Sequence, residues 1–208
     1  MTSNQPVQTA LDLFGSLEEG VSSSAASSIS ALLAATLAVS AAKRTFDGVP
    51  DNSSQGAVQI LVDAAESRRE EIRILVEKEM AKPMALQLST LLFESDPAEA
   101  DFQDALETSS EVPLMIFRVC FDLVKVLHRL SAYCPPRTGA EVETAVNLTL
   151  ATMSSVRTRL EEVLARFDNR QRAEDTLTEL DGNTTSAGDL LEQTLTLIRN
   201  KMFAHDTQ

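Results

Sequence analysis

The side chains that most often carry out catalysis or bind metals are few in this chain of 208 residues. It has two histidines, His128 and His205, and two cysteines, Cys120 and Cys134. Their spacing fits neither a His-x-x-x-His zinc motif nor a paired-cysteine site, and two thiols do not make a disulfide framework. The glycine-rich phosphate-binding motifs of nucleotide enzymes are also missing from the sequence. We therefore expect no bound metal and no separate cofactor.

His128 is the histidine placed among apolar residues, since Val124 and Leu127 precede it on the same expected helix. Near the end of a helix, a protonated imidazole interacts favourably with the negative end of the helix dipole. A partly buried structural role is therefore favoured over a catalytic one. His205 lies in the C-terminal tail, where catalysis is less expected still.

Serines and charged residues offer further candidates, each with a structural explanation beside the chemical one. The serines within residues 22–30 could supply a nucleophile, but no histidine or lysine is adjacent to activate one. Helix capping and close packing explain them more simply. Acidic runs such as 66–71 and 161–162 alternate with arginines at helical spacing, which is typical of a solvated helix face with weak ion pairs.

The elements that must position these residues are all helices. Apolar residues recur every three to four positions, glycine and proline number only seven each, and no alternating strand pattern is present. The pattern predicts an all-α bundle of long, kinked, antiparallel helices. The expected helices are about 8–19, 22–45, 56–93 with a kink at Pro83, 98–132 with a kink at Pro113, 141–167, 170–181 and 185–204. Residues 1–208 are expected to form a single helical domain, with 168–208 as its C-terminal helical extension.

The charge balance argues against two kinds of partner. Eighteen basic and 31 acidic residues give a formal charge of −13, which repels nucleic-acid phosphates and anionic membrane surfaces. The uncharged stretch 25–42 is diluted by serine and threonine, so a buried helix is favoured over a transmembrane one. The N-terminal residues lack a signal-peptide pattern, and the cysteines are those of a reducing compartment, so we expect a cytoplasmic protein.

One local motif and the order of segments around it carry a family resemblance. Residues 111–114 read Glu-Val-Pro-Leu and are followed by Arg118-Val119-Cys120, while the Ala-rich helix through Ile29-Ser30 and the Arg68-Arg69 region fit in order and spacing. This arrangement resembles the formiminotransferase-cyclodeaminase and methenyltetrahydrofolate cyclohydrolase family over about residues 8–200. The resemblance implies a small all-helical, usually dimeric fold. It also implies water or ammonia exchange at an iminium-like carbon of a tetrahydrofolate derivative.

Four motifs of that family are altered in this sequence. Before the Ala-rich helix the family has Pro-Gly-Gly-Gly-Ser, whereas residues 20–25 read Gly-Val-Ser-Ser-Ser-Ala, and serines narrow a ligand's approach to backbone N–H groups. The Asn-x-Thr-x-Gly-Lys-Lys-x-Tyr stretch is reduced to Lys-Arg-Thr-Phe at 43–46. Asp-x-x-Ala-Phe becomes Lys-x-x-Ala-Lys at 78–82, and Ser-Asp-Ala-Gly becomes Thr-Gly-Ala-Glu at 138–141. Loss of all four predicts that the usual folate reaction is absent.

Two functions remain open at this point. The first is a diverged enzyme that acts on an imine-like or cyclic small molecule by water or ammonia exchange or by cyclisation, as a hydrolase, lyase or cyclase. The second is a non-catalytic binding or assembly protein built on the same scaffold. For the enzyme, the resemblance implies candidate catalytic residues Glu77, Glu79 and Lys82, and candidate substrate-binding residues Ser23, Ser24, Lys43, Arg137 and Thr138.

The Ala-rich helix also predicts self-association. It carries no charge from residue 22 to 42, and a helix of this kind must bury nearly its whole circumference. One layer of neighbours from a chain of this size leaves a face of the helix open. Since the resemblance also implies a two-fold dimer, we expect a homodimer in which Ser30, Ala34 and Ala38 meet their own copies.

Overall fold

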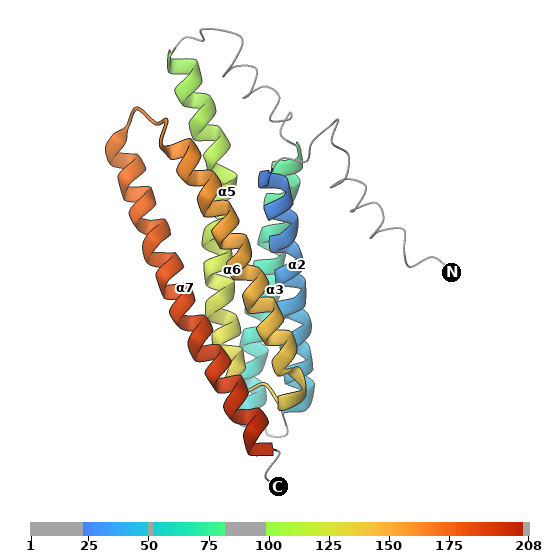
Figure 1. Cartoon of the computed structure of the whole chain (residues 1–208). Coiled ribbons are helices and arrows are strands. Elements are labelled where there is room, and N and C mark those ends of the chain that lie inside the picture. Colours follow the sequence, from blue (N-terminus) through green and yellow to red (C-terminus); the bar gives the residue numbers. More distant parts are fainter. Residues whose placement is uncertain (1–22, 50–51, 82–98, 206–208) are drawn as a thin grey trace.

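A computed structural model describes residues 23–49, 52–81 and 99–205, and these residues are helical with short connections (Figure 1). The helices are α2 (Ser23–Gly48), α3 (Asn52–Ala81), α5 (Glu99–Ser131), α6 (Pro136–Leu164) and α7 (Arg170–His205). The described part of the chain contains no strand, which confirms the all-α fold class. The expected helix 8–19 and the kink at Pro83 lie outside the described residues.

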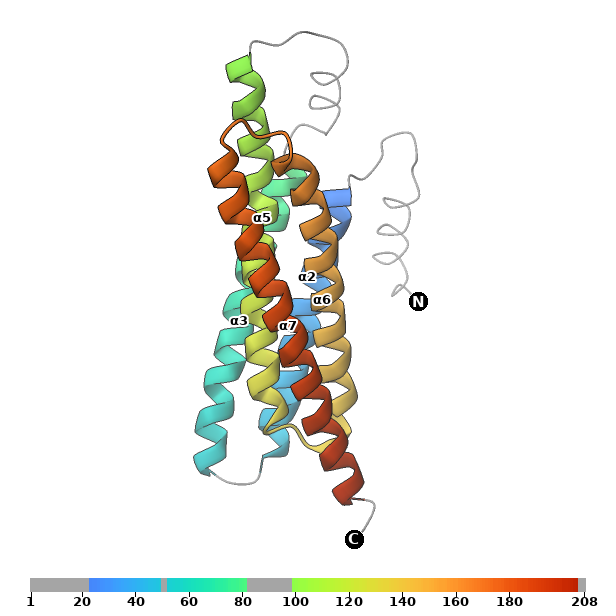
Figure 2. The same ribbon diagram turned by 60° about the vertical axis from the view of Figure 1, so that its left-hand side comes forward.

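Each helix runs antiparallel to the next described one, so the bundle has two distinct ends (Figures 1 and 2). We call the upper end the one where α2, α5 and α7 begin and where α3 and α6 end. The lower end holds the opposite termini of these helices. α2 packs against α3 and α6, α5 packs against α3 and α6, and α7 covers α5 and α6.

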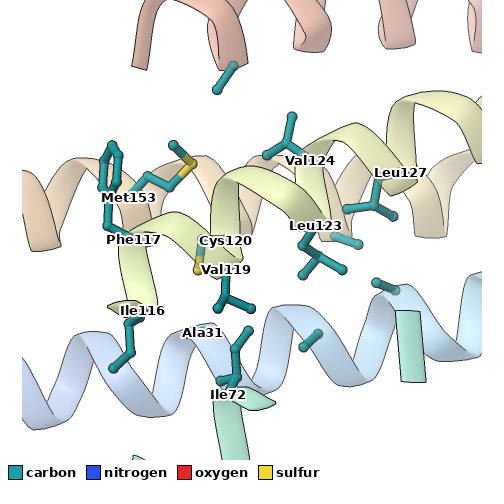
Figure 3. Close-up of a cluster of buried hydrophobic side chains, with 14 of the residues drawn as sticks. Ala31, Ile72, Ile116, Phe117, Val119, Cys120, Leu123, Val124, Leu127 and Met153 are labelled. Atoms are coloured by element: carbon teal, nitrogen blue, oxygen red, sulfur yellow. The ribbon is translucent and has the colours of Figure 1, made fainter. Parts of the chain in front are cut away.

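The core is aliphatic and is centred on α5. Its inward side chains Phe117, Leu123 and Leu127 are fully buried, and they meet Ile72 of α3 and Met153 of α6 in one continuous cluster (Figure 3). Pro113 lies inside α5 without ending the helix. Burial of this apolar stripe, at about 25 cal/mol per Å² removed from water, supplies the main driving force for the fold.

The small side chains of α2 serve packing within the chain. Ala34 and Ala38 have no exposed surface in the single chain, so their expected contact with a second copy is wrong. Small residues were needed there because α3 and α6 both approach α2 closely. The face of α2 left open instead includes Leu33, which is 54% exposed, and Thr36. By length and composition alone Ala26–Gly48 could span a membrane, but half of its apolar window is buried in the bundle.

The C-terminal part of the chain is one helix, where two shorter ones were expected. Residues 181–183 do not break α7, because a single glycine inside a helix costs only about 1 kcal/mol. Leu180 and Ala187 are buried on either side of Gly182, and Asp181 pairs with Arg157 of α6 at 2.8 Å. Tertiary contacts therefore outweigh the local break signal.

α6 begins earlier than expected, at Pro136, because proline suits the first turn of a helix. Thr138 and Gly139, expected in a loop, are consequently buried helical residues. Gly139 allows α7 to approach α6, since a Cβ at this position would lie 2.8 Å from Cγ2 of Ile198.

Candidate functional site

Part of the candidate set lies at the upper end of the bundle. Ser23 and Ser24 are the first two residues of α2, and Glu77 and Glu79 lie in the last turns of α3. Glu77 is exposed and pairs with Arg73 one turn earlier. Glu79 is half-buried, and its Oε2 is inaccessible to solvent. The side chains of Ser23 and Ser24, together with all of Lys82, lie outside the described residues.

The remaining candidates lie at the lower end. Lys43, near the end of α2, is exposed and pairs with Glu66 of α3 at 2.7 Å, and this contact lowers the pKa of Glu66. Arg137, in the first turn of α6, extends over the end of α2, where its guanidinium lies beside Gly48. Thr138 is buried and donates its hydroxyl proton to the carbonyl of Pro135 at 3.0 Å. Lys43 and Thr138 thus each have a structural partner, whereas Arg137 has only its close approach to Gly48.

The structure does not bring the candidates among the described residues together within one chain. Ser24 and Lys43 are nineteen residues apart on the same helix, which separates them by about 28 Å at about 1.5 Å per residue. No small substrate spans that distance. The chain thus offers two separate groups, an upper one with the carboxylates and a lower one with the cations.

At the lower end the structure adds an ion pair that the sequence did not indicate. Arg44 of α2 pairs with Oε1 of Glu141 on α6, and Oε2 of Glu141 is buried with no hydrogen-bond partner among the described residues. Glu141 stands where the family motif has glycine. Glu141 follows Arg137 by one helical turn, and this spacing was the available sign in the sequence that Glu141 takes part in an ion pair. Its actual partner, Arg44 of α2, is 97 positions away, so the spacing could not identify it.

Lys201 of α7 caps the C-terminal end of α5, at the lower end of the bundle. Its ammonium donates to the carbonyls of Ser131, Ala132 and Cys134 at 2.9, 2.7 and 3.1 Å. The last carbonyls of a helix have no intrahelical partner, and a lysine near them satisfies these acceptors and the helix dipole together. Lys201 therefore acts as a structural cap supplied by another helix, and no sequence pattern had marked it.

His128 also has a structural role, as expected. It is half-buried on α5, and its Nδ1 lies 3.2 Å from Oγ1 of Thr194 on α7. The Thr194 hydroxyl donates its proton to the carbonyl of Leu190 at 2.7 Å, so it must accept the bond from His128. His128 therefore carries a proton on Nδ1, and the bond joins α5 to α7.

The cysteines are unsuited to nucleophilic chemistry. Cys120 is fully buried, and burial raises the pKa of its thiol to about 12. Burial also raises the pKa of Cys134. Since the thiolate is the reactive form, both side chains act as small apolar residues. Within the described ranges, no three His, Cys, Asp or Glu side chains converge on a point where a metal ion could bind.

Charged side chains on the outer faces of the helices form the ion pairs expected from their spacing. Arg73 bonds to Glu70 at 2.7 Å and also contacts Glu77, and Arg157 bonds to Glu161 at 2.8 Å. These pairs are largely exposed, so each contributes at most about 1 kcal/mol. The prediction that the charged runs form solvated faces is confirmed for these pairs.

Comparison with known proteins identifies the fold and the family. The formiminotransferase-cyclodeaminase family model matches residues 7–182, ending in the middle of α7. The crystal structure of formiminotetrahydrofolate cyclodeaminase from Thermotoga maritima superposes with a TM-score of 0.76 and 18% sequence identity, covering 91% of this chain and 95% of that one. A comparison with curated proteins finds no significant match. The family resemblance and the cyclodeaminase-like helical fold are thus confirmed.

Proposed function

The chain belongs to the formiminotransferase-cyclodeaminase family, and from this premise we propose that it is a diverged cyclodeaminase-like enzyme. Its substrate is an imine-like or cyclic small molecule, which reacts by exchange of water or ammonia. The observation that carries the proposal is the retention of the fold over nearly the whole chain, although the family's motifs are altered. A tetrahydrofolate derivative remains the substrate class implied by the family, but the altered motifs favour a different molecule.

The reaction is assigned to the upper end, because the carboxylates lie there. Water adds to the carbon of the C=N bond while a carboxylate accepts its proton, and the departing nitrogen takes a proton as the C–N bond breaks. Glu79 suits this role better than Glu77, because its half-buried carboxylate is less hydrated than the exposed carboxylate of Glu77. Ser23 and Ser24 remain candidates for substrate binding, and Lys82, which lies outside the described residues, remains a candidate catalytic residue.

The lower group is assigned a smaller part in this proposal. Lys43, Arg137 and Thr138 remain candidates for binding a substrate only if a second subunit brings its own lower end to the reaction site. The contacts of Lys43 with Glu66 and of Thr138 with Pro135 already account for the presence of these two residues.

Substitution of Glu79 tests the assignment. We expect Glu79→Gln to reduce kcat by about 100-fold or more, the range typical of a lost general acid or base, and to alter the pH profile of kcat/KM. Glu70→Gln is the matched control, because Glu70 lies on the exposed face of the same helix and contacts Arg73. Unchanged kcat in Glu79→Gln would contradict the role of Glu79.

The second candidate function is a non-catalytic binding or assembly protein. It is favoured by the structural partners of Glu77, Lys43 and Thr138, which leave these side chains with no need of a ligand. The two functions differ in an observable way. An assembly protein keeps its biological activity when Glu79 is replaced, and loses it when its surface of association is disrupted.

We propose that the chain forms a homodimer through the outer α2/α6 face. This face comprises the outward residues of two adjacent helices: Ile29, Leu33, Thr36 and Ser40 of α2, and Thr144, Asn147, Ala151 and Ser155 of α6. It carries no charge, although the chain as a whole has a charge of −13. Two copies repel each other least through such a surface.

Charge introduced at Leu33 tests the dimer. We expect Leu33→Asp to yield folded monomers in light scattering, because an aspartate buried without a partner in the interface is unfavourable. Ile60→Asp is the matched control, since Ile60 is a 69% exposed apolar residue on α3, outside the proposed face. A monomeric wild-type protein, or equal disruption by both variants, would refute the interface.

The other expectations about partners and location stay predictions. They are a small-molecule ligand, the absence of nucleic-acid and membrane partners, and a cytoplasmic location.

A further inference from the structure

A polar depression lies on the outer surface between α5 and the first three turns of α7. Its volume is about 420 Å³, and it is lined only by polar side chains: Arg118 of α5, and Asn169, Gln171, Arg172, Asp175, Thr176 and Glu179 around the start of α7. It contains none of the candidate residues of the proposed reaction site. It therefore calls for an explanation of its own, independent of the proposed function.

The walls of the depression are held in place by contacts between helices. Arg118 binds Glu179 through two parallel hydrogen bonds of 2.7 and 2.6 Å, a planar geometry that fixes the guanidinium. Arg172 binds Glu107 of α5 at 2.6 Å. Gln103 fastens the turn before α7, since its amide donates to the carbonyl of Arg166 and accepts from the N–H of Asp168.

These contacts leave several donors of the lining residues without an acceptor among the described residues. Glu179 occupies Nε and Nη2 of Arg118, so Nη1 has no acceptor among the described residues. Arg172 uses Nη1 for Glu107 and retains Nε and Nη2. Asn169 accepts the backbone N–H of Arg172 with its carbonyl oxygen, which leaves its amide N–H₂ as a further donor. The remaining acceptors include the second oxygen of Asp175, whose first oxygen binds Gln171, the amide oxygen of Gln171, and the hydroxyl oxygen of Thr176, whose proton goes to the carbonyl of Arg172.

The local charge also differs from that of the whole chain. Among the lining residues, the positive charges of Arg118 and Arg172 balance the negative charges of Asp175 and Glu179, whereas the chain as a whole has a charge of −13. A ligand that approaches this region meets a lining with no net charge, which repels an anion less than the rest of this acidic molecule does.

We propose that this depression binds a small oxyanion of the phosphate type, either free or as the ester group of a small metabolite. Two guanidinium groups held about a common space recognise the oxygens of such a group by charge-assisted hydrogen bonds. Asn169 supplies a third donor. The site is open to solvent, so the affinity for a single phosphate group is modest, with a dissociation constant of about 1 mM.

The test is a titration of the full chain with inorganic phosphate, followed by calorimetry and by the NMR shifts of backbone amides. The shifts are expected in residues 166–179 and in the turn of α5 around Arg118. Glycerol phosphate and sulfate form the other arms of the titration. Tighter binding of the ester than of inorganic phosphate assigns the site to a metabolite, and the reverse order assigns it to the free ion.

Three variants make the result specific. Arg172→Gln is expected to weaken phosphate binding by about tenfold, and Asp175→Asn to tighten it several-fold, because the first removes a donor and the second a competing charge. Arg73→Gln is the matched control, since Arg73 is an exposed arginine on α3 that is likewise paired with glutamates. The proposal is overturned if phosphate shows no saturable binding, or if Arg73→Gln weakens binding as much as Arg172→Gln.

Discussion

Replacement of Lys201 by Met removes the cap that α7 supplies to the end of α5. The ammonium of Lys201 donates to the carbonyls of Ser131, Ala132 and Cys134, of which Ser131 and Cys134 are buried residues. Methionine keeps an unbranched apolar stem of similar length but offers no donor. Water can reach the exposed Ala132 carbonyl, whereas the Cys134 carbonyl loses its partner inside the protein and the Ser131 carbonyl keeps only the weak S–H donor of Cys134 at 3.5 Å.

The magnitude follows from the number of acceptors left without a donor. A buried acceptor that loses a charged donor costs about 1–3 kcal/mol, and the two bonds share one ammonium, so their costs do not add in full. We expect Lys201→Met to lower the free energy of unfolding by about 2–3 kcal/mol. For a chain of this size the melting temperature then falls by about 5–10 °C.

Urea unfolding followed by circular dichroism measures this loss. Lys43→Met is the matched control, because Lys43 is an exposed lysine with a single ion pair to Glu66, and its removal costs at most about 1 kcal/mol. The reasoning is refuted if Lys201→Met unfolds at the wild-type midpoint, or if both variants lose the same free energy.

Three further predictions follow from the packing and the charges. Gly139→Ala should destabilise the protein by about 1–2 kcal/mol in urea unfolding, because the new Cβ meets Ile198 of α7. Gly182→Ala should stabilise it by about 0.5–1 kcal/mol, because a Cβ there meets nothing within 4 Å. Equal effects of the two substitutions would contradict the packing described for Gly139. Burial raises the pKa of the Cys120 thiol to about 12, so this thiol should resist iodoacetamide at pH 8 until urea is added. Mass spectrometry that finds Cys120 alkylated in the native protein would contradict this prediction. The hydrogen bond from Arg118 lowers the pKa of Glu179 in the folded protein. The pair therefore stabilises the fold at pH values above the pKa that Glu179 has in the unfolded chain, and this stabilisation is lost as the pH falls through the lower pKa of the folded state. Glu179→Gln should therefore cost about 0.5–1 kcal/mol at pH 7 and progressively less below about pH 4, and a cost independent of pH would count against this assignment.

Most of the fold could be predicted from the sequence, because it depends on local periodicity. Val142, Val146 and Met153 recur on one side of α6, and they are buried in the structure as this spacing requires. The break expected at Gly182 failed for a physical reason. A local helix propensity of about 1 kcal/mol cannot compete with the burial of Leu180 on one side of it and Ala187 on the other.

The candidate site could be predicted only in part, because its members are distant in sequence. Position relative to the family's motifs indicated Glu77 and Glu79, which lie together, but also Lys43, which lies at the other end of the bundle. The role of Lys201 depends on carbonyls about seventy residues away, and backbone acceptors leave no mark in the sequence. The composition of α2 correctly indicated close packing, but it did not reveal that the neighbours are helices of the same chain.

The central claim is that this protein is an enzyme of altered substrate specificity on the cyclodeaminase fold. The most direct measurement is turnover by the purified full chain, with methenyl- and formiminotetrahydrofolate assayed beside a panel of cyclic imines and small polar metabolites. Our account predicts turnover of at least one imine with a higher kcat/KM than either folate, and loss of that turnover in Glu79→Gln. Rates that do not exceed the uncatalysed reaction for every compound would contradict it and favour the assembly protein.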